Sequence, residues 1–137
     1  MDITKSMATA ASGMKVQSDR MRINAENIAN ASSTATGANG QPYRRQVVTF
    51  KAAVDEATGA NLVVTDRVVR DRSDFKLTYN PGHPAADAQG YVRLPNVNSL
   101  IEMTDMREAQ RAYEANLNVV DAARNMMVRT LDLLRRS

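Results

Sequence analysis

Apolar residues recur at helical spacing near the start of the chain. One stripe, with steps of four and three residues, consists of Ile3, Met7, Ala10, Met14, Gln17, Met21, Asn24 and Ile28. This spacing puts every member on one face of an α-helix, and Asp2 stands where the first turn needs a cap. Gly13 weakens such a helix by about 1 kcal/mol relative to Ala. The pattern predicts a long N-terminal helix that needs a partner along this face.

The helical spacing stops after Ile28. Residues 30–45 are rich in Ser, Thr, Gly and Asn, a composition that predicts a loop. Strand-forming stretches follow at residues 47–50, 61–69, 75–79 and 91–94. In the third stretch, Phe75, Leu77 and Tyr79 alternate with polar residues, as in a strand with one covered face. We expect a small antiparallel sheet between two helices.

A second helical pattern occupies the C-terminal part of the chain. Ser99 and Glu102 have the S-x-x-E spacing of a capping box, which predicts the helix start. Steps of three and four residues then give a seam with coiled-coil spacing: Met106, Ala109, Tyr113, Asn116, Val120, Ala123, Met127, Thr130 and Leu134. The sequence thus predicts an α+β fold with a coiled-coil-like helical core. We divide it into an N-terminal helix at residues 1–30, a loop and small β region at 31–95, and a C-terminal helix at 96–137.

Neither predicted helix is stable alone. The large apolar side chains of the first stripe contribute at most about 1.5 to 3 kcal/mol each on burial. Ordering the backbone costs about 1 to 2 kcal/mol for every residue. Each seam therefore needs cover, either from the other end of the same chain or from neighbouring copies. The residues alone leave both arrangements open, and a head-to-tail contact that does not close would give a filament.

Composition excludes some chemistry and leaves location open. The chain carries a formal charge of +3, but its acids and bases alternate, so nucleic-acid binding is not implied. A basic helical nucleic-acid binder stays as a distant alternative. Cysteine is absent, which removes disulfides and thiolate chemistry. The N-terminus lacks the apolar run of a cleaved signal peptide, and no stretch approaches membrane-spanning length, so we expect no direct membrane insertion.

Candidate catalytic residues are few. His83 is the single histidine and lies four residues before Asp87, so a small hydrolase using His83 is one hypothesis. Turn geometry around Pro81 and Pro84 explains the same residues more simply. Residues 66–74 hold three Arg and three Asp, a neutral balance that favours a solvated strand or turn. We predict no catalytic residue, metal site or cofactor.

Three segments resemble the flagellar axial proteins. "NAENIANASST" at residues 24–34 is similar to a motif near their N-terminus, and "AQRAYEANLNVVDAARNMMVRTLDLL" is similar to their C-terminal helix. "NPGHPAADAQGYVRLPNVN" at residues 80–98 is similar to a segment of the basal-body rod proteins within that family. Two departures are Asn80, where the rod segment has Asp, and a looser loop after residue 31.

The resemblance implies a non-enzymatic subunit of the proximal rod, which polymerises helically to form the drive shaft across the bacterial periplasm. It implies export through the flagellar type III apparatus without signal cleavage. The implied partners are other copies, sister rod proteins, the rod adaptor and the MS ring. Another axial protein of the rod or hook is the alternative within the family. The two stripes then predict an assembly interface made of Ile3, Met7, Met14, Met21, Asn24, Ile28, Met106, Ala109, Tyr113, Asn116, Val120, Ala123, Met127 and Leu134.

Overall fold

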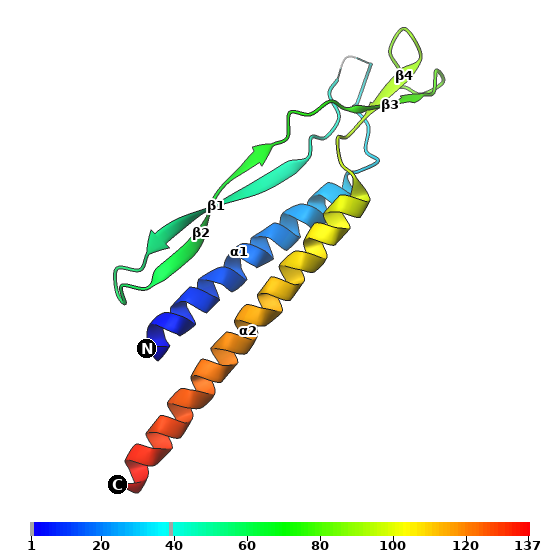
Figure 1. The fold of residues 1–137 in the computed structure, drawn as a ribbon. Coiled ribbons are helices and arrows are strands. Elements are labelled where there is room, and N and C mark those ends of the chain that lie inside the picture. The colour runs from blue at the N-terminus through cyan, green and yellow to red at the C-terminus, as the bar shows by residue number, and fades with distance from the viewer. Residues whose placement is uncertain (1, 39) are drawn as a thin grey trace.

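Two long helices lie antiparallel and side by side (Figure 1). The structure is a computed structural model that describes residues 2–38 and 40–137. In chain order its elements are α1 (Ile3–Ala29), β1 (Gln46–Val54), β2 (Asn61–Arg70), β3 (Lys76–Tyr79), β4 (Tyr91–Leu94) and α2 (Ser99–Arg136). The β1–β2 hairpin runs along α1, and β3 and β4 lie beyond the end where α1 finishes and α2 begins. The predicted α+β fold with two long helices is confirmed.

Both ends of α1 are capped by their own side chains. The Asp2 carboxylate accepts hydrogen bonds from Thr4 N at 2.9 Å and Lys5 N at 3.4 Å, so the predicted cap is confirmed. At the other end, Asn30 donates from its backbone N to Glu26 O at 3.1 Å and from Nδ2 to the same oxygen at 2.9 Å. These bonds end the helix where the apolar stripe ends.

The predicted capping box of α2 is wrong. Asn98 is the N-cap, and its side chain accepts a hydrogen bond from Leu100 N at 3.1 Å. Ser99 is already helical, and Glu102 is fully buried and turned toward α1 instead of back to the helix start. The cap residue lies one position earlier because long-range partners hold the Glu102 carboxylate.

The strands form two separate antiparallel pairs instead of the one sheet that we expected. Gln46 lies opposite Arg70 at one end of the β1–β2 hairpin, and Val54 lies opposite Asn61 at the other. In the β3–β4 pair, the rings of Tyr79 and Tyr91 meet edge to face at 5.4 Å between centroids. All four residues of β3 are exposed, so the predicted covered face is wrong, because no helix extends to that pair.

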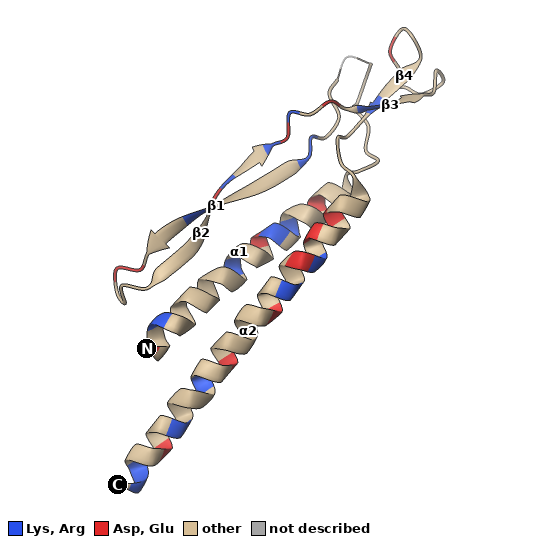
Figure 2. Cartoon of the chain, viewed as in Figure 1, with Lys and Arg blue, Asp and Glu red and all other residues tan. Residues whose placement is uncertain are grey.

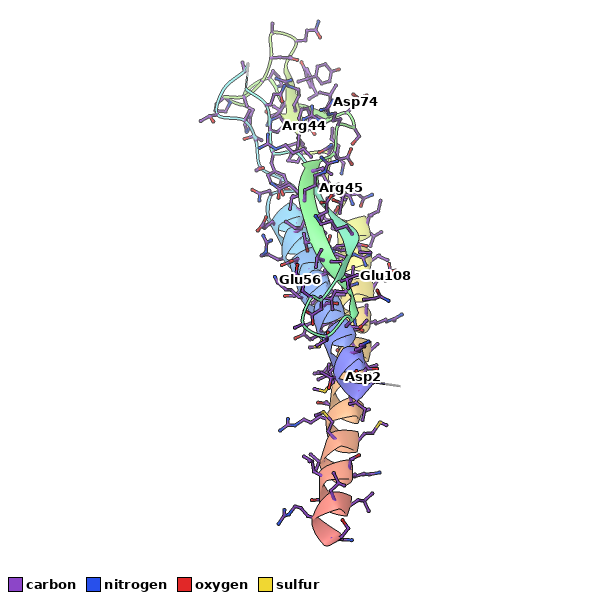
Figure 3. All side chains as sticks on the ribbon, turned by 90° about the vertical axis from the view of Figure 1, so that its left-hand side faces the viewer. Asp2, Arg44, Arg45, Glu56, Asp74 and Glu108 are labelled. Carbon is purple, nitrogen blue, oxygen red and sulfur yellow. The ribbon has the colours of Figure 1, made fainter. Side chains whose placement is uncertain are left out.

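The β1–β2 hairpin packs on a second face of α1 that the sequence analysis did not identify. Val16 and Ile23 are buried. Thr9 Oγ1 donates to Asn61 O at 2.8 Å, Ser12 Oγ accepts from Val63 N at 3.2 Å, and Asp19 Oδ2 accepts from Thr65 Oγ1 at 2.8 Å. These residues recur every three or four positions, as a helix face requires. Helix α1 therefore lies between α2 and the hairpin (Figure 3).

Candidate assembly interface

Small side chains line the contact between α1 and α2. Ala10 and Gly13 of α1 are buried, as are Ala109 and Ala123 of α2. A Cβ added at Gly13 would lie 2.6 Å from Asn116 Nδ2, so the two helices approach closely at this point. The distance between the helix axes is therefore set by residues with little bulk.

The helix pair keeps one register along its length. Asn24 Nδ2 donates to Asp105 Oδ2 at 2.9 Å, and Gly13 faces Asn116, so equal steps along α1 and α2 connect the two contacts. The same register sets Ile3 opposite Met126. Because α1 begins at Ile3, the remainder of α2, residues 127–136, projects about 15 Å beyond it. We call residues 127–136 the overhang.

The structure brings most of the predicted interface residues together inside one chain. Asn24, Ala109 and Ala123 are buried at the helix contact. A larger group is half-buried along its flanks: Ile3, Met7, Met14, Met21, Ile28, Met106, Tyr113, Asn116 and Val120. Met127 and Leu134 belong to the overhang and are exposed. The predicted seam is therefore divided between a covered part and an uncovered part.

A buried polar cluster joins the helices to the β region, and the sequence analysis missed it. Asn27 is fully buried and uses its whole side-chain amide. Its Oδ1 accepts from Tyr43 OH at 2.7 Å and Gln46 N at 2.9 Å, and its Nδ2 donates to Gln46 O at 2.8 Å and Glu102 Oε2 at 3.2 Å. Burial, followed by the charges of Glu26 and Glu102, raises the pKa of Tyr43.

Arg45 completes this cluster. Its Nε donates to Glu102, which is fully buried, so the carboxylate is paired as a buried charge must be. The Arg45 backbone N donates to Asn96 Oδ1 at 2.8 Å, and Asn96 Nδ2 donates to Asp71 O at 3.0 Å. Asn27 and Asn96 occur in two of the segments that carry the family resemblance, and this was the available signal for them.

A second ion pair bridges the helices next to the cluster. Arg20 contacts Asp105 through Nε at 3.1 Å and through Nη2, and the Arg20 side chain is 21% exposed. The hydrogen bond from Arg20, assisted by one from Asn24, holds the pKa of Asp105 below its ordinary value. Figure 2 shows this part of α2, with several acidic residues, beside basic positions of α1.

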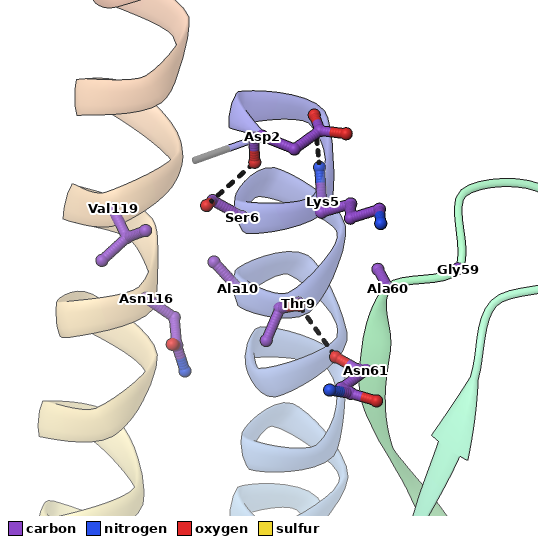
Figure 4. A pocket seen from close by; sticks show the side chains of 10 residues that line it. All are labelled: Asp2, Lys5, Ser6, Thr9, Ala10, Gly59, Ala60, Asn61, Asn116 and Val119. Atoms are coloured by element: carbon purple, nitrogen blue, oxygen red, sulfur yellow. Dashed lines mark hydrogen bonds between the residues drawn. The ribbon is translucent and has the colours of Figure 1, made fainter.

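The overhang carries apolar side chains that no other part of residues 2–38 and 40–137 covers. Met126, which precedes it, is 55% exposed, Leu131 is 59% exposed and Leu134 is 66% exposed. Next to the overhang lies a hollow between the start of α1, the hairpin turn and α2 (Figure 4). Thr9, Ala10, Asn116 and Val119 line part of it. This end of the molecule thus combines an apolar helix face with an open hollow.

The segment around His83 is organised as a turn. His83 Nδ1 accepts a hydrogen bond from Ala85 N at 3.0 Å, and Asp87 Oδ1 accepts from Gln89 N and Tyr91 N. Gly90 has a φ of +87°, and a Cβ there would lie 2.8 Å from the Tyr79 ring. In residues 2–38 and 40–137 no group of three or more acidic or histidine side chains could hold a metal ion. Over the same residues, neither helix has the length and apolar content that a bilayer crossing requires.

Comparison with known proteins defines the class. Residues 88–133 match the family model described as flagellar basal body rod FlgEFG protein C-terminal. This stretch includes β4 and most of α2, including part of the overhang. The match places this stretch among the structural proteins of the flagellar basal-body rod.

Relatives that match most of the chain define the family more narrowly. The flagellar basal-body rod protein FlgC of Agrobacterium fabrum is 51% identical over 128 residues, which cover 93% of this chain and 92% of the relative. The FlgC protein of Salmonella typhimurium is 44% identical and covers 90% and 92%. That of Aquifex aeolicus is 39% identical and covers 96% and 97%. The chain belongs to the flagellar basal-body rod protein FlgC family.

Proposed function

We propose that the chain is a non-enzymatic subunit that polymerises helically, with other copies and with sister rod proteins, into the proximal rod. The rod forms the drive shaft across the periplasm, with the rod adaptor and the MS ring beneath it. The chain reaches this site through the flagellar type III export apparatus, without cleavage of a signal peptide. The N- and C-terminal helices form the assembly core, and the β region lies outside.

The overhang is the observation that carries this proposal. Most of the stability of a helix in a protein comes from packing its apolar face against another segment. An apolar face that stays exposed is therefore typical of a site that binds a partner. Within residues 2–38 and 40–137 no segment does so, while the rest of the same seam is covered by α1. A neighbouring copy that lays its own helices along the overhang continues the seam from one subunit to the next.

The predicted interface residues have different roles in this proposal. Half-buried residues at the flanks of the helix pair, such as Met7, Met14 and Met21, are available to a lateral neighbour. Their flexible side chains adapt to slightly different neighbours along a mixed rod. Met127 and Leu134 of the overhang contact the neighbour with their exposed surface, which is larger for Leu134. Buried Asn24 and Ala109 hold the subunit together instead.

Two charged substitutions on the overhang test the proposal. Leu131→Asp with Leu134→Asp should reduce incorporation into isolated basal bodies by more than about tenfold, since burying two carboxylates at an apolar contact is costly. The thermal unfolding of the purified subunit should stay unchanged, because both side chains are exposed. Asn118→Asp with Asn125→Asp adds the same charge to exposed positions of α2 and serves as the control. Normal incorporation of the leucine variant would contradict the proposal.

A further inference from the structure

Positive charge gathers at one end of the β1–β2 hairpin. A single hollow there is lined by Gln41, Arg44, Arg67, Val69, Arg70 and Arg72. We call it the arginine hollow. A neighbouring hollow shares Gln41, Arg44 and Arg70 with it and adds Tyr43. Arg67, Arg70 and Arg72 are exposed, so their guanidinium groups are open to a partner.

Two of the three acids of residues 66–74 have a partner outside the arginine hollow. Asp71 accepts from Ser73 N at 2.9 Å and lies 3.5 Å from Arg45 Nη1, on the inner side of the hairpin end. Asp66 lies 3.4 Å from Lys51 Nζ, across the two strands. Asp66 Oδ2 also lies 3.9 Å from Arg67 Nε, a weak pair between exposed side chains. Asp74 forms no ion pair among the described residues, so Asp66 and Asp74 offset only part of the charge of the four arginines. Residues 66–74 carry no net charge, but the fold gathers their three arginines around the arginine hollow.

The guanidinium group of Arg44 is held in one orientation by the chain itself. Its Nη1 donates to Asp71 O and Ser73 O at 3.2 Å each, and its guanidinium carbon lies 4.2 Å from the centre of the Phe75 ring. A guanidinium that is fixed in this way loses little conformational entropy when it binds a carboxylate. The arginine hollow therefore has one ordered donor group and three adjustable ones.

Two acids lie at the opposite end of the same hairpin, where Lys5 of α1 approaches Gly59 and offsets part of their charge. Asp55 and Glu56 lie in the turn that joins β1 to β2, which we call the acidic turn. Asp55 is fixed by hydrogen bonds from the Thr58 hydroxyl and from Ala57 N, while Glu56 is exposed and forms no ion pair among the described residues. Figure 3 shows Arg44 and Glu56 toward opposite ends of the hairpin. The strands between them span about 30 Å.

We propose that the acidic turn of one copy docks into the arginine hollow of a second copy, head to tail along the helix direction. The proposal rests on the proposed function, since it describes one contact within the polymer. Opposite charges at the two ends of one hairpin favour a contact that repeats without closing. The overhang projects from the same end as the acidic turn, so both features face the same neighbour. Carboxylates on a protruding turn also suit the forked donors of arginine.

The absence of cysteine allows a direct test in assembled rods. Gln41→Cys beside the arginine hollow and Ala57→Cys beside the acidic turn keep every charge, and both positions are exposed. When both changes are made in one chain, a thiol-specific crosslinker should give dimers and larger multimers in isolated basal bodies. Each single variant, crosslinked in the same way, is the control and should stay monomeric, because like ends do not meet.

Charge reversal in this double-cysteine chain completes the test. Arg70→Glu with Arg72→Glu should reduce the crosslinked fraction by more than about tenfold, and adding Glu56→Arg should restore part of it. Lys15→Glu with Arg22→Glu makes the same change in net charge at exposed positions of α1, whose ion pairs are local to that helix, and should have little effect.

Three outcomes would overturn the proposed contact. In the first, basal bodies contain the double-cysteine chain at normal levels but give no multimers, and rod assembly itself is then unaffected. In the second, the crosslinks join this chain to a different protein, which makes that protein the acidic partner. In the third, the crosslinked fraction is indifferent to charge reversal. Absence of the unmodified chain from basal bodies would instead overturn the proposed function, together with this contact.

Discussion

Single polar residues decide how the helices join the β region. Asn27 forms four hydrogen bonds, and its partners come from the loop, from β1 and from α2. No apolar residue of similar size could satisfy these groups, and each group left unpaired in the interior costs about 1 to 3 kcal/mol.

Replacement of Asn27 should therefore destabilise the subunit strongly. We expect Asn27→Ala to lower the free energy of unfolding by about 3 kcal/mol, since it leaves the Tyr43 hydroxyl, both backbone groups of Gln46 and part of Glu102 without partners. Urea unfolding followed by circular dichroism measures this change. Asn118→Ala removes an exposed amide of α2 and is the matched control. Equal midpoints for the two variants would show that the cluster contributes little.

The ion pair between Arg20 and Asp105 should give a dependence on pH. Because Arg20 lowers the pKa of Asp105 in the folded chain, the pair stabilises the fold at neutral pH. This contribution is lost as the pH falls below about 4, where the unfolded carboxylate begins to take up a proton.

Asp105→Asn should lower the stability at pH 7 by about 1 to 2 kcal/mol and should flatten the loss of stability in acid. Thermal unfolding at pH 7 and at several values below 4 compares the variant with the parent chain. Asp71 and Asp55 also have lowered pKa values, through hydrogen bonds from Ser73 and Thr58, so part of the acid sensitivity should remain. An unchanged slope in the variant would contradict this role of Asp105.

Predictions from the sequence were least successful for single residues. Helical spacing identifies faces by their apolar residues, so it passed over Asn27 and Glu102, which are buried because of partners distant in the sequence. The capping box at Ser99 was wrong for the same reason, since Arg45 holds Glu102 from 57 positions away. Local patterns cannot contain such long-range pairings.

At the scale of elements, α1 has two packed faces and α2 has one. The α1 stripe toward α2 was predictable because Met and Ile recur there. The stripe toward the hairpin was not, because Thr9, Ser12 and Asp19 look like surface residues. They are polar because they form hydrogen bonds with β2, two with its backbone and one with the Thr65 side chain. Both helices and the positions of the strands were predictable, whereas the division into two hairpins was not, because strand partners depend on long-range contacts.

Gly13 tests how closely the two helices must approach. We expect Gly13→Leu to lower the free energy of unfolding by about 2 kcal/mol, since the added side chain must displace Asn116 or separate the helices. Leu is the better helix former, so helix propensity alone predicts the opposite sign. Ala11→Leu, at an exposed position of the same helix, is the control. Chemical denaturation of both variants separates the two effects.

For the whole molecule, one end is complete and the other is not. The polar cluster joins α1, α2 and the hairpin where α1 ends and α2 begins. The overhang extends from the far end, and no other segment that the structure describes covers it. The sequence alone left open whether the seams meet within one chain or between copies. The structure assigns the first part of the α2 seam to its own chain, and the proposed rod assembly assigns the overhang to a neighbour.

Amide hydrogen exchange should report this division directly. In the dilute subunit we expect strong protection of α2 from about residue 102 to 123 and fast exchange in residues 127–136, because a short helix without tertiary contacts is only marginally stable in water. In isolated basal bodies the same C-terminal amides should become protected, since a neighbour then covers them. Slow exchange of the overhang in the dilute subunit would mean that it is stable without a partner, and the need for a neighbouring copy would then disappear.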